Sequence, residues 1–302
     1  MNQISSPSRS LSRIEPFGSH PIPLGVEVLG LPAAVGILTA LHAAPRVPLD
    51  RVPAEGVPSG TVLIVPGFTG SKEDFLSFLP LLAERGWNVW AYSQRGQADS
   101  AAPAGVENYT LDRMAADAVE VASLIGPGPI HLLGHSLGGV IASAAAIAAP
   151  SNFKSLTMFC SGPHGWPDRQ QQTTDTVSKT GSLGLWERVN PGLVNASDAQ
   201  LGPEMAFLRV RAAHTSSDNL LAGAEILRNH QDPSAALCDS GLPVLVTHGE
   251  DDKAWPQDWQ QQLAEDIGER AQYRVIPGGA HSPQLESPRA TAEALDAFWR
   301  SI

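Results

Sequence analysis

The segment around residue 136 restricts the possible folds of this chain more than any other. Residues 134–138 read Gly-His-Ser-Leu-Gly and stand between an apolar stretch at 130–134 and an alanine-rich stretch at 137–149. The first stretch predicts a buried strand and the second a helix, with Ser136 at the tight turn between them. Glycines suit such a turn because larger side chains would clash with its neighbours. The context favours a nucleophile elbow over a glycine-rich helix start that binds an anion.

Strand and helix patterns alternate along much of the chain. Strands are predicted at residues 61–65, 88–92, 130–134, 156–159, 244–247 and 273–276. Helices are predicted at residues 71–85, 110–125, 137–149, 257–267 and 288–301, with Ser71 and Thr110 as N-cap candidates. This alternation predicts an α/β fold in which a mainly parallel sheet is covered by helices on both faces.

One long segment, from about residue 164 to 237, contains no strong strand pattern. Helical patterns occur there at residues 180–189 and 203–230. Because an insertion this long between sheet strands is usually functional, we interpret 164–237 as a cap on a core formed by 24–163 and 238–302. One helical face in the cap is apolar, which fits substrate contact or plain core packing; its residues are Met205, Leu208, Ala212 and Leu220.

The N-terminal region carries no clear targeting signal. Residues 1–23 are rich in serine, arginine and proline, which predicts a disordered tail. The following apolar segment, residues 24–44, is long enough to suggest a membrane span. However, it contains Glu27, Pro32 and His42, and a charged group within lipid is costly. We therefore expect a core-packed segment without a transmembrane span and a cytoplasmic protein.

Charge and composition exclude several classes of function. A formal net charge of −11, without a lysine and arginine cluster, argues against nucleic acid as a partner. The acidity disfavours anionic substrates at long range, although local charge in a cleft can override it. Arg209 and Arg211 are candidates for contact with an acidic substrate, although arginines on such a helix are usually solvated.

Neither a cofactor nor a metal is indicated. The sequence has no dinucleotide or phosphate-loop motif. His131 and His135 lie four residues apart on a predicted strand without a metalloprotease motif, and we interpret His135 as packing at the elbow. The two cysteines, Cys160 and Cys238, lack metal-ligand spacing, and we expect both side chains to be buried in the protein. So few cysteines favour a protein of a reducing compartment.

The remaining groups needed for serine catalysis follow other predicted strands. His281 lies in the loop 277–283 after the last strand, so it can reach the sheet edge where the elbow lies and accept the serine proton. An acidic run, residues 250–252, follows the strand at 244–247 and offers a carboxylate to orient that histidine. Backbone amides of residues 67–70, with that of Leu137, are candidate donors to an oxyanion.

With these motifs, the chain resembles the α/β-hydrolase superfamily from about residue 60 to its end, apart from the insertion. The string Asn-Val-Trp-Ala-Tyr-Ser-Gln-Arg-Gly at 88–96, extended to Ser100, is similar to the family's third-strand segment and its RGxGxS turn. Pro-Gly-Phe-Thr-Gly at 66–70 is similar to loops of small carboxylesterases and monoglyceride-lipase-like enzymes. The resemblance implies the α/β-hydrolase fold and the following roles: nucleophile Ser136, acid Asp252, base His281, and oxyanion amides Phe68 and Leu137.

The chain departs from the family pattern at two positions outside the triad. Pro66 replaces the common histidine, and an aspartate common after the third strand is missing around Ser93 and Gln94. We expect hydrolysis of a small-molecule carboxylic ester through an acyl-enzyme. The alternatives are carbon–carbon bond hydrolysis of a diketone-like substrate and a non-catalytic ligand receptor on the same fold. The sequence leaves the acyl chain length and the oligomeric state open.

Overall fold

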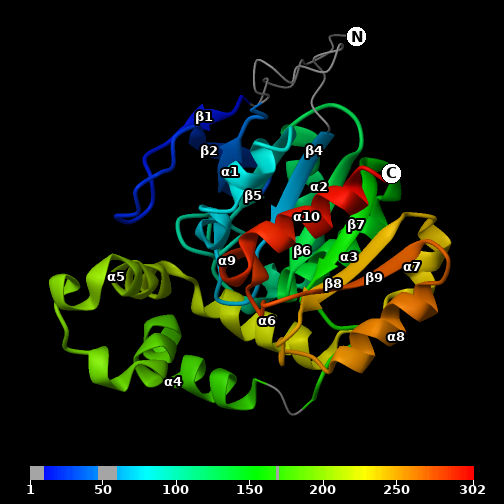
Figure 1. Cartoon of the computed structure of the whole chain (residues 1–302). Coiled ribbons are helices and arrows are strands. Elements are labelled where there is room, and N and C mark those ends of the chain that lie inside the picture. Colours follow the sequence, from blue (N-terminus) through cyan, green and yellow to red (C-terminus); the bar gives the residue numbers. More distant parts are fainter. Residues whose placement is uncertain (1–9, 47–59, 168–169) are drawn as a thin grey trace, which may run out of the picture.

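The computed structural model describes residues 10–46, 60–167 and 170–302, and within these a nine-stranded sheet has the order β1-β2-β3-β5-β4-β6-β7-β8-β9 (Figure 1). The strands are β1 Ser12–Arg13, β2 Val26–Ala33, β3 Gly36–Ala43, β4 Gly60–Val65, β5 Trp87–Tyr92, β6 Ile130–His135, β7 Phe153–Phe159, β8 Val244–Gly249 and β9 Ala271–Ile276. Neighbours from β5 to β9 are parallel, and the β1-β2-β3-β5 end is antiparallel. The predicted mainly parallel sheet is confirmed.

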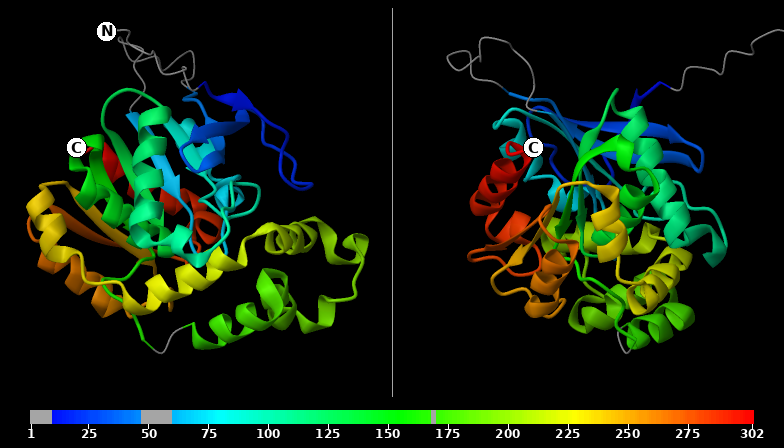
Figure 2. Two further views of the ribbon diagram at one scale, coloured as in Figure 1. Left: turned by 180° about the vertical axis from the view of Figure 1, so that it is seen from behind. Right: turned by 90° about the vertical axis from the view of Figure 1, so that its right-hand side faces the viewer.

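Helices cover both faces of this sheet (Figure 2). Apolar residues of α2 Leu111–Leu124, α3 Leu137–Ala148 and α8 Gln257–Ile267 pack into one core layer. Those of α1 Leu79–Ala83 and α10 Pro288–Trp299 pack into the other. Shorter helical turns are η1 Lys72–Phe75, η2 Val106–Tyr109, η3 Pro150–Asn152 and α9 Pro283–Glu286. Coverage on both faces explains why the last four residues of β4 are all buried.

The N-terminal region differs from the predicted disordered tail. Residues 1–9 lie outside the described residues, but the prediction is wrong for residues 10–23. Ser12–Arg13 pairs with β2, and the His20 ring lies 4.2 Å from the Phe207 ring, centroid to centroid. Contacts with residues distant in the chain, which local composition does not reveal, hold this segment in place. The core-packed segment predicted at residues 24–44 is confirmed as the largely buried β2–β3 hairpin.

The described residues between β7 and β8 form four helices, α4 Gln171–Val189, α5 Asp198–His214, α6 Ser217–Asn229 and α7 Ser234–Ser240, with the turn η4 Pro191–Leu193. In both figures α4 and α5 extend away from the sheet, and α6 lies nearer to it. The prediction of a single helix at residues 203–230 is wrong. This segment is divided at Thr215 and Ser216, which have extended backbones, and the Ser216 side chain caps the start of α6.

The helix predicted at residues 71–85 is also interrupted. A 3₁₀ turn, η1, begins after Ser71 with a capping box, so the predicted cap position is confirmed. A separate helix, α1, then begins at Leu79 and has Pro80 in its first turn. Proline lacks a backbone N–H and fits a first turn better than a helix interior, which explains the interruption.

Candidate active site

The predicted nucleophile stands at the sharp turn between β6 and α3. Ser136 has φ 56° and ψ −120°, a conformation that non-glycine residues rarely adopt. Its amide donates a hydrogen bond of 2.9 Å to the carbonyl oxygen of Phe159 on the neighbouring strand β7. The packed strand and helix therefore hold Ser136 in a strained backbone conformation, as is frequent at functional sites.

Two glycines allow this turn to form. A Cβ atom at Gly134 would lie 2.1 Å from the carbonyl oxygen of Gly138. A Cβ atom at Gly138 would lie 2.2 Å from the carbonyl oxygen of Val65 on β4. Both distances are far below contact with a backbone atom, so the pattern of residues 134–138 is a steric requirement of the turn.

A continuous set of hydrogen bonds joins the three side chains that the sequence selected. The Ser136 hydroxyl lies 3.1 Å from His281 Nε2, with which it can share its proton, and His281 Nδ1 lies 3.0 Å from Asp252 Oδ1. The same carboxylate oxygen accepts the amide of Ala254 at 2.8 Å. The Asp252 side chain is fully buried, whereas the His281 side chain is 39% exposed. A buried acid thus orients an imidazole that remains accessible beside the serine.

The three acidic residues after β8 differ in burial and in contacts. Asp252 is buried and contacts His281, but Asp251 and Glu250 are exposed. One Glu250 carboxylate oxygen instead accepts the amide of Gly278 at 3.2 Å, within the loop that leads to His281. Among the three acids, the geometry brings only Asp252 to the imidazole.

His135 supports the loop that carries His281. Its Nε2 donates a hydrogen bond of 2.7 Å to the backbone carbonyl oxygen of His281. Burial lowers the pKa of His135 to about 4, so near neutral pH the ring is uncharged, with its proton on Nε2. His135 therefore does more than pack at the elbow, because it fixes the backbone of the predicted base.

One group of potential metal ligands lies beside this site. Ligand atoms of His135, Cys160 and His281 lie within 4.8 Å of one another. These atoms already have other partners: His135 Nε2 donates to the His281 carbonyl oxygen, and the two His281 ring nitrogens contact Asp252 and Ser136. Burial and the nearby Asp252 charge raise the pKa of Cys160 well above its ordinary value, so it is a poor thiolate ligand. Cys160 is buried as predicted, but Cys238 is exposed and that prediction is wrong.

The residues of the two predicted oxyanion amides lie beside the nucleophile. Phe68 lies in the turn after β4, and Leu137 is the first residue of α3, where a helix amide has no intrahelical acceptor. A Cβ atom at Gly67 would lie 3.0 Å from Ser136 Cβ, so the turn passes directly beside the nucleophile. Among the described residues, neither amide has a carbonyl partner in the turn, loop and cap hydrogen bonds, which leaves both available as donors.

Two glutamines that the sequence interpretation missed hold this turn. Gln94 Nε2 donates to the carbonyl oxygen of Pro66 at 2.6 Å, and Gln97 Nε2 donates to that of Gly67 at 2.8 Å. Gln97 Oε1 accepts the amide of Gln94 at 3.0 Å, and both side chains are buried. The position that departs from the family's aspartate is therefore part of a brace for the oxyanion turn. The departure itself was the available signal.

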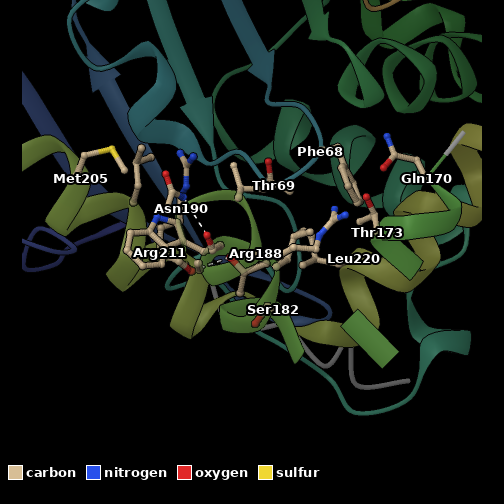
Figure 3. Close-up of a pocket in the computed structure, with 16 residues that line it drawn as sticks. Phe68, Thr69, Gln170, Thr173, Ser182, Arg188, Asn190, Met205, Arg211 and Leu220 are labelled. Atoms are coloured by element: carbon tan, nitrogen blue, oxygen red, sulfur yellow. Dashed lines mark hydrogen bonds between the residues drawn. The ribbon is translucent and has the colours of Figure 1, made fainter. Parts of the chain in front are cut away.

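A cavity of about 450 Å³ opens beside Phe68 and Thr69, between α4, α5 and α6 (Figure 3). The four apolar residues singled out from the sequence, Met205, Leu208, Ala212 and Leu220, all line it. The triad side chains are not part of the lining, so the cavity adjoins the nucleophile through the oxyanion turn. Its size suits a small organic molecule.

The two arginines noted in the sequence have different positions. Arg211 lines the cavity and forms an ion pair with Asp74, close to the oxyanion turn. Arg209 pairs with Asp198, and its guanidinium carbon lies 6.0 Å from the centroid of the Trp186 ring. Arg211, but not Arg209, is therefore placed at the cavity. Arg188 also lines it, although the sequence interpretation did not select that residue.

No helix within the described residues is long and apolar enough to cross a membrane. Among curated proteins, a Variovorax paradoxus protein named as a carbamate hydrolase, RutD, is 35% identical over 244 residues, covering 76% of this chain and 86% of the relative. The pimeloyl-(acyl-carrier protein) methyl ester esterase of Nitrosomonas europaea is 30% identical over 204 residues, covering 63% and 77% respectively.

Solved structures share the fold at lower identity. A thermophilic esterase from Thermogutta terrifontis has a TM-score of 0.69 at 22% identity, covering 91% of this chain and 98% of that one. The enol-lactonase from Burkholderia xenovorans LB400 has a TM-score of 0.68 at 18% identity, covering 86% and 96%. The sequence model of the alpha/beta hydrolase fold matches residues 60–288. With its strand-to-helix serine turn and mainly parallel sheet, the chain belongs to the alpha/beta hydrolase family.

Proposed function

We propose that this hydrolase cleaves a carboxylic ester of a small molecule through a serine acyl-enzyme. The observation that carries the proposal is the hydrogen-bonded series Ser136–His281–Asp252 at the strained turn. A serine hydroxyl is a weak nucleophile until a base takes its proton, and here an oriented imidazole lies within reach.

In the proposed mechanism, Ser136 Oγ attacks the ester carbonyl carbon while His281 Nε2 takes the hydroxyl proton. The buried Asp252 carboxylate stabilises the resulting imidazolium. The amides of Phe68 and Leu137 donate to the negative oxygen of the tetrahedral intermediate. Its collapse breaks the bond to the alcohol oxygen, which receives the proton from His281. Water, deprotonated by the same imidazole, then attacks the acyl-enzyme and releases the acid and Ser136.

The choice of an ester bond rests on the site together with the relatives. One similar protein is named as a methyl ester esterase, whereas others are named as carbamate hydrolases or proline iminopeptidases. All three names describe acyl transfer to water, the chemistry that this arrangement suits. No contact within the described residues favours carbon–carbon bond cleavage or a receptor role over hydrolysis of an ester.

We further propose that residues 164–237 act as a cap over a core of 24–163 and 238–302. Helices α4, α5 and α6 provide most of the cavity lining, and the core contributes Phe68 and Thr69. Substrate selection then belongs to the inserted helices and chemistry to the core loops. The cytoplasm remains the proposed location on the sequence grounds given above.

The test compares p-nitrophenyl esters with matched carbamates, an amino-acid anilide and a diketone. We expect hydrolysis of the esters at the highest kcat/KM, lost by at least about a thousandfold in Ser136→Ala. Ser143→Ala is the matched control, because Ser143 lies on α3 and donates to the carbonyl of Val140. Faster turnover of the diketone or the anilide than of every ester would contradict the proposed bond class. Binding without turnover of any substrate would indicate a receptor.

A further inference from the structure

The cavity beside the oxyanion turn differs in charge from the protein as a whole. The chain carries a formal net charge of −11. Among the described residues that line the cavity, however, two are arginines and none is an aspartate, glutamate or lysine. The remainder are apolar or neutral polar side chains. A positively charged cavity in an acidic protein is a local exception that favours an anionic ligand.

The two arginines are not equivalent. Arg211 already forms an ion pair with Asp74 and a hydrogen bond to Ser71, so a carboxylate largely satisfies its charge. Arg188, at the end of α4, donates to the neutral side-chain oxygen of Gln172 at 3.1 Å. It has no acidic partner within residues 10–46, 60–167 and 170–302. Its guanidinium therefore remains available to a ligand.

Arg188 is placed to recognise a group of the substrate other than the reacting bond, because it lines the cavity whereas the triad side chains do not. Figure 3 shows its side chain on the cavity wall near Thr173, on α4. Phe68 marks the end of the cavity nearest the nucleophile, because Gly67 approaches Ser136 directly. Apolar side chains, including Leu185 and Leu220, line the same cavity. An occupant thus meets the oxyanion turn, an apolar wall and a cation.

We infer that the cavity selects esters that carry a carboxylate at the end of an apolar arm, and that Arg188 is the residue that recognises this carboxylate. A guanidinium can donate two parallel hydrogen bonds to a carboxylate, which gives both energy and direction. The inference rests on the proposed esterase function and adds the substrate class. Arg188 is a specificity residue and takes no part in bond cleavage.

Two matched substrate series test the inference. In the first, p-nitrophenyl monoesters of dicarboxylic acids are compared with p-nitrophenyl esters of monocarboxylic acids of equal chain length. In the second, acetate esters of ω-hydroxy acids are compared with acetate esters of the corresponding alkanols, followed by pH-stat. The first series places the carboxylate on the acyl side and the second on the alcohol side. The measured quantity is the ratio of kcat/KM for the anionic ester to that for the neutral ester.

We expect the wild-type ratio to exceed one in one series, by about tenfold at low salt, and to decline as salt screens the charges. Arg188→Gln should lower that ratio about tenfold, and Arg188→Lys should keep part of it. Arg113→Gln is the matched control, since Arg113 is exposed on α2 and outside the cavity lining; its ratio should equal that of the wild type.

A ratio at or below one in both series for the wild-type protein would overturn the inference. An unchanged ratio in Arg188→Gln would do the same, because another group would then recognise the carboxylate. Both results are compatible with an active esterase. Failure of the esterase proposal looks different: neither neutral nor anionic esters are hydrolysed, although the protein is folded by circular dichroism.

Discussion

The side-chain amide of Gln97 donates a hydrogen bond of 2.8 Å to the backbone carbonyl oxygen of Gly67, directly before Phe68. Gln94 makes the equivalent contact to Pro66. These contacts join the loop after β5 to the turn after β4, and thereby fix the backbone whose amide we assign to the oxyanion. The positions of Gln94 and Gln97 should therefore affect how well the Phe68 amide stabilises the oxyanion of the proposed reaction.

Gln97→Ala should lower kcat by about 10- to 100-fold with a smaller change in KM, because a displaced Phe68 amide stabilises the oxyanion less. Steady-state kinetics on a p-nitrophenyl ester give both parameters. Gln261→Ala is the matched control, since Gln261 is exposed on α8. A rise in KM at constant kcat would instead assign Gln97 to substrate binding.

Asp252→Asn should reduce kcat by about 10³- to 10⁴-fold, because the amide no longer favours the required His281 tautomer. Asp251→Asn and Glu250→Gln, at exposed positions, should each change kcat less than about threefold. Parallel measurement of the three variants identifies the acid. A large loss of kcat in Asp251→Asn, with an unchanged kcat in Asp252→Asn, would show that the acid is Asp251 and that the assignment of Asp252 is wrong.

His131 should make folding stability depend on pH. Burial lowers its pKa from 6.5 to about 4, and Nδ1 contacts Ser155 Oγ at 2.8 Å. As the pH falls below about 6.5, His131 becomes protonated in the unfolded chain, whereas in the folded protein it stays neutral until about pH 4. The free energy of unfolding therefore falls, by about 2 kcal/mol between pH 7 and pH 5 for this residue.

Urea unfolding of the wild type and of His131→Gln at both pH values measures this contribution. The variant should lose about 2 kcal/mol less on acidification than the wild type does. Its absolute stability at pH 7 does not enter the comparison. Parallel pH dependence in the two proteins would show that His131 is protonated equally in both states.

The apolar wall of the cavity should determine the preferred chain length. Met205→Ala and Leu208→Ala enlarge the space and should shift the maximum of kcat/KM toward longer esters. Each mismatched methylene is worth about 1–3 kcal/mol in an apolar pocket. Val275→Ala, at an exposed position of β9, is the control. An unchanged chain-length profile together with reduced thermal stability would make these side chains structural.

Local patterns predicted the elements that form the core. Thr110 accepts the amide of Arg113 as the predicted cap of α2, and α8 spans the predicted Gln257–Ile267. The strand-to-helix context of Ser136 was visible because steric requirements place glycines at short, fixed intervals. His281 was assigned as the base because it lies in the loop after the last strand, and in the structure its Nε2 contacts the Ser136 hydroxyl.

Contacts between distant segments escaped prediction. The hydrogen bonds from Gln94 and Gln97 reach a turn formed earlier in the chain. The departure from the family's aspartate marks the position around Gln94, but no local pattern indicates which backbone groups the two side chains contact. The contact of His20 with Phe207 likewise joins the N-terminal segment to α5 and replaces the predicted disorder. The sequence interpretation did not select Arg188, because the cavity that it lines forms only when α4, α5 and α6 come together.

The central claim is that Ser136 becomes covalently acylated. Treatment with a fluorophosphonate, followed by proteolysis and mass spectrometry, reports the modified residue directly. We predict one adduct, on the peptide that contains Ser136, with equal loss of esterase activity, and no adduct in Ser136→Ala. An adduct on a different serine, or full esterase activity in the Ser136→Ala protein, would contradict the account.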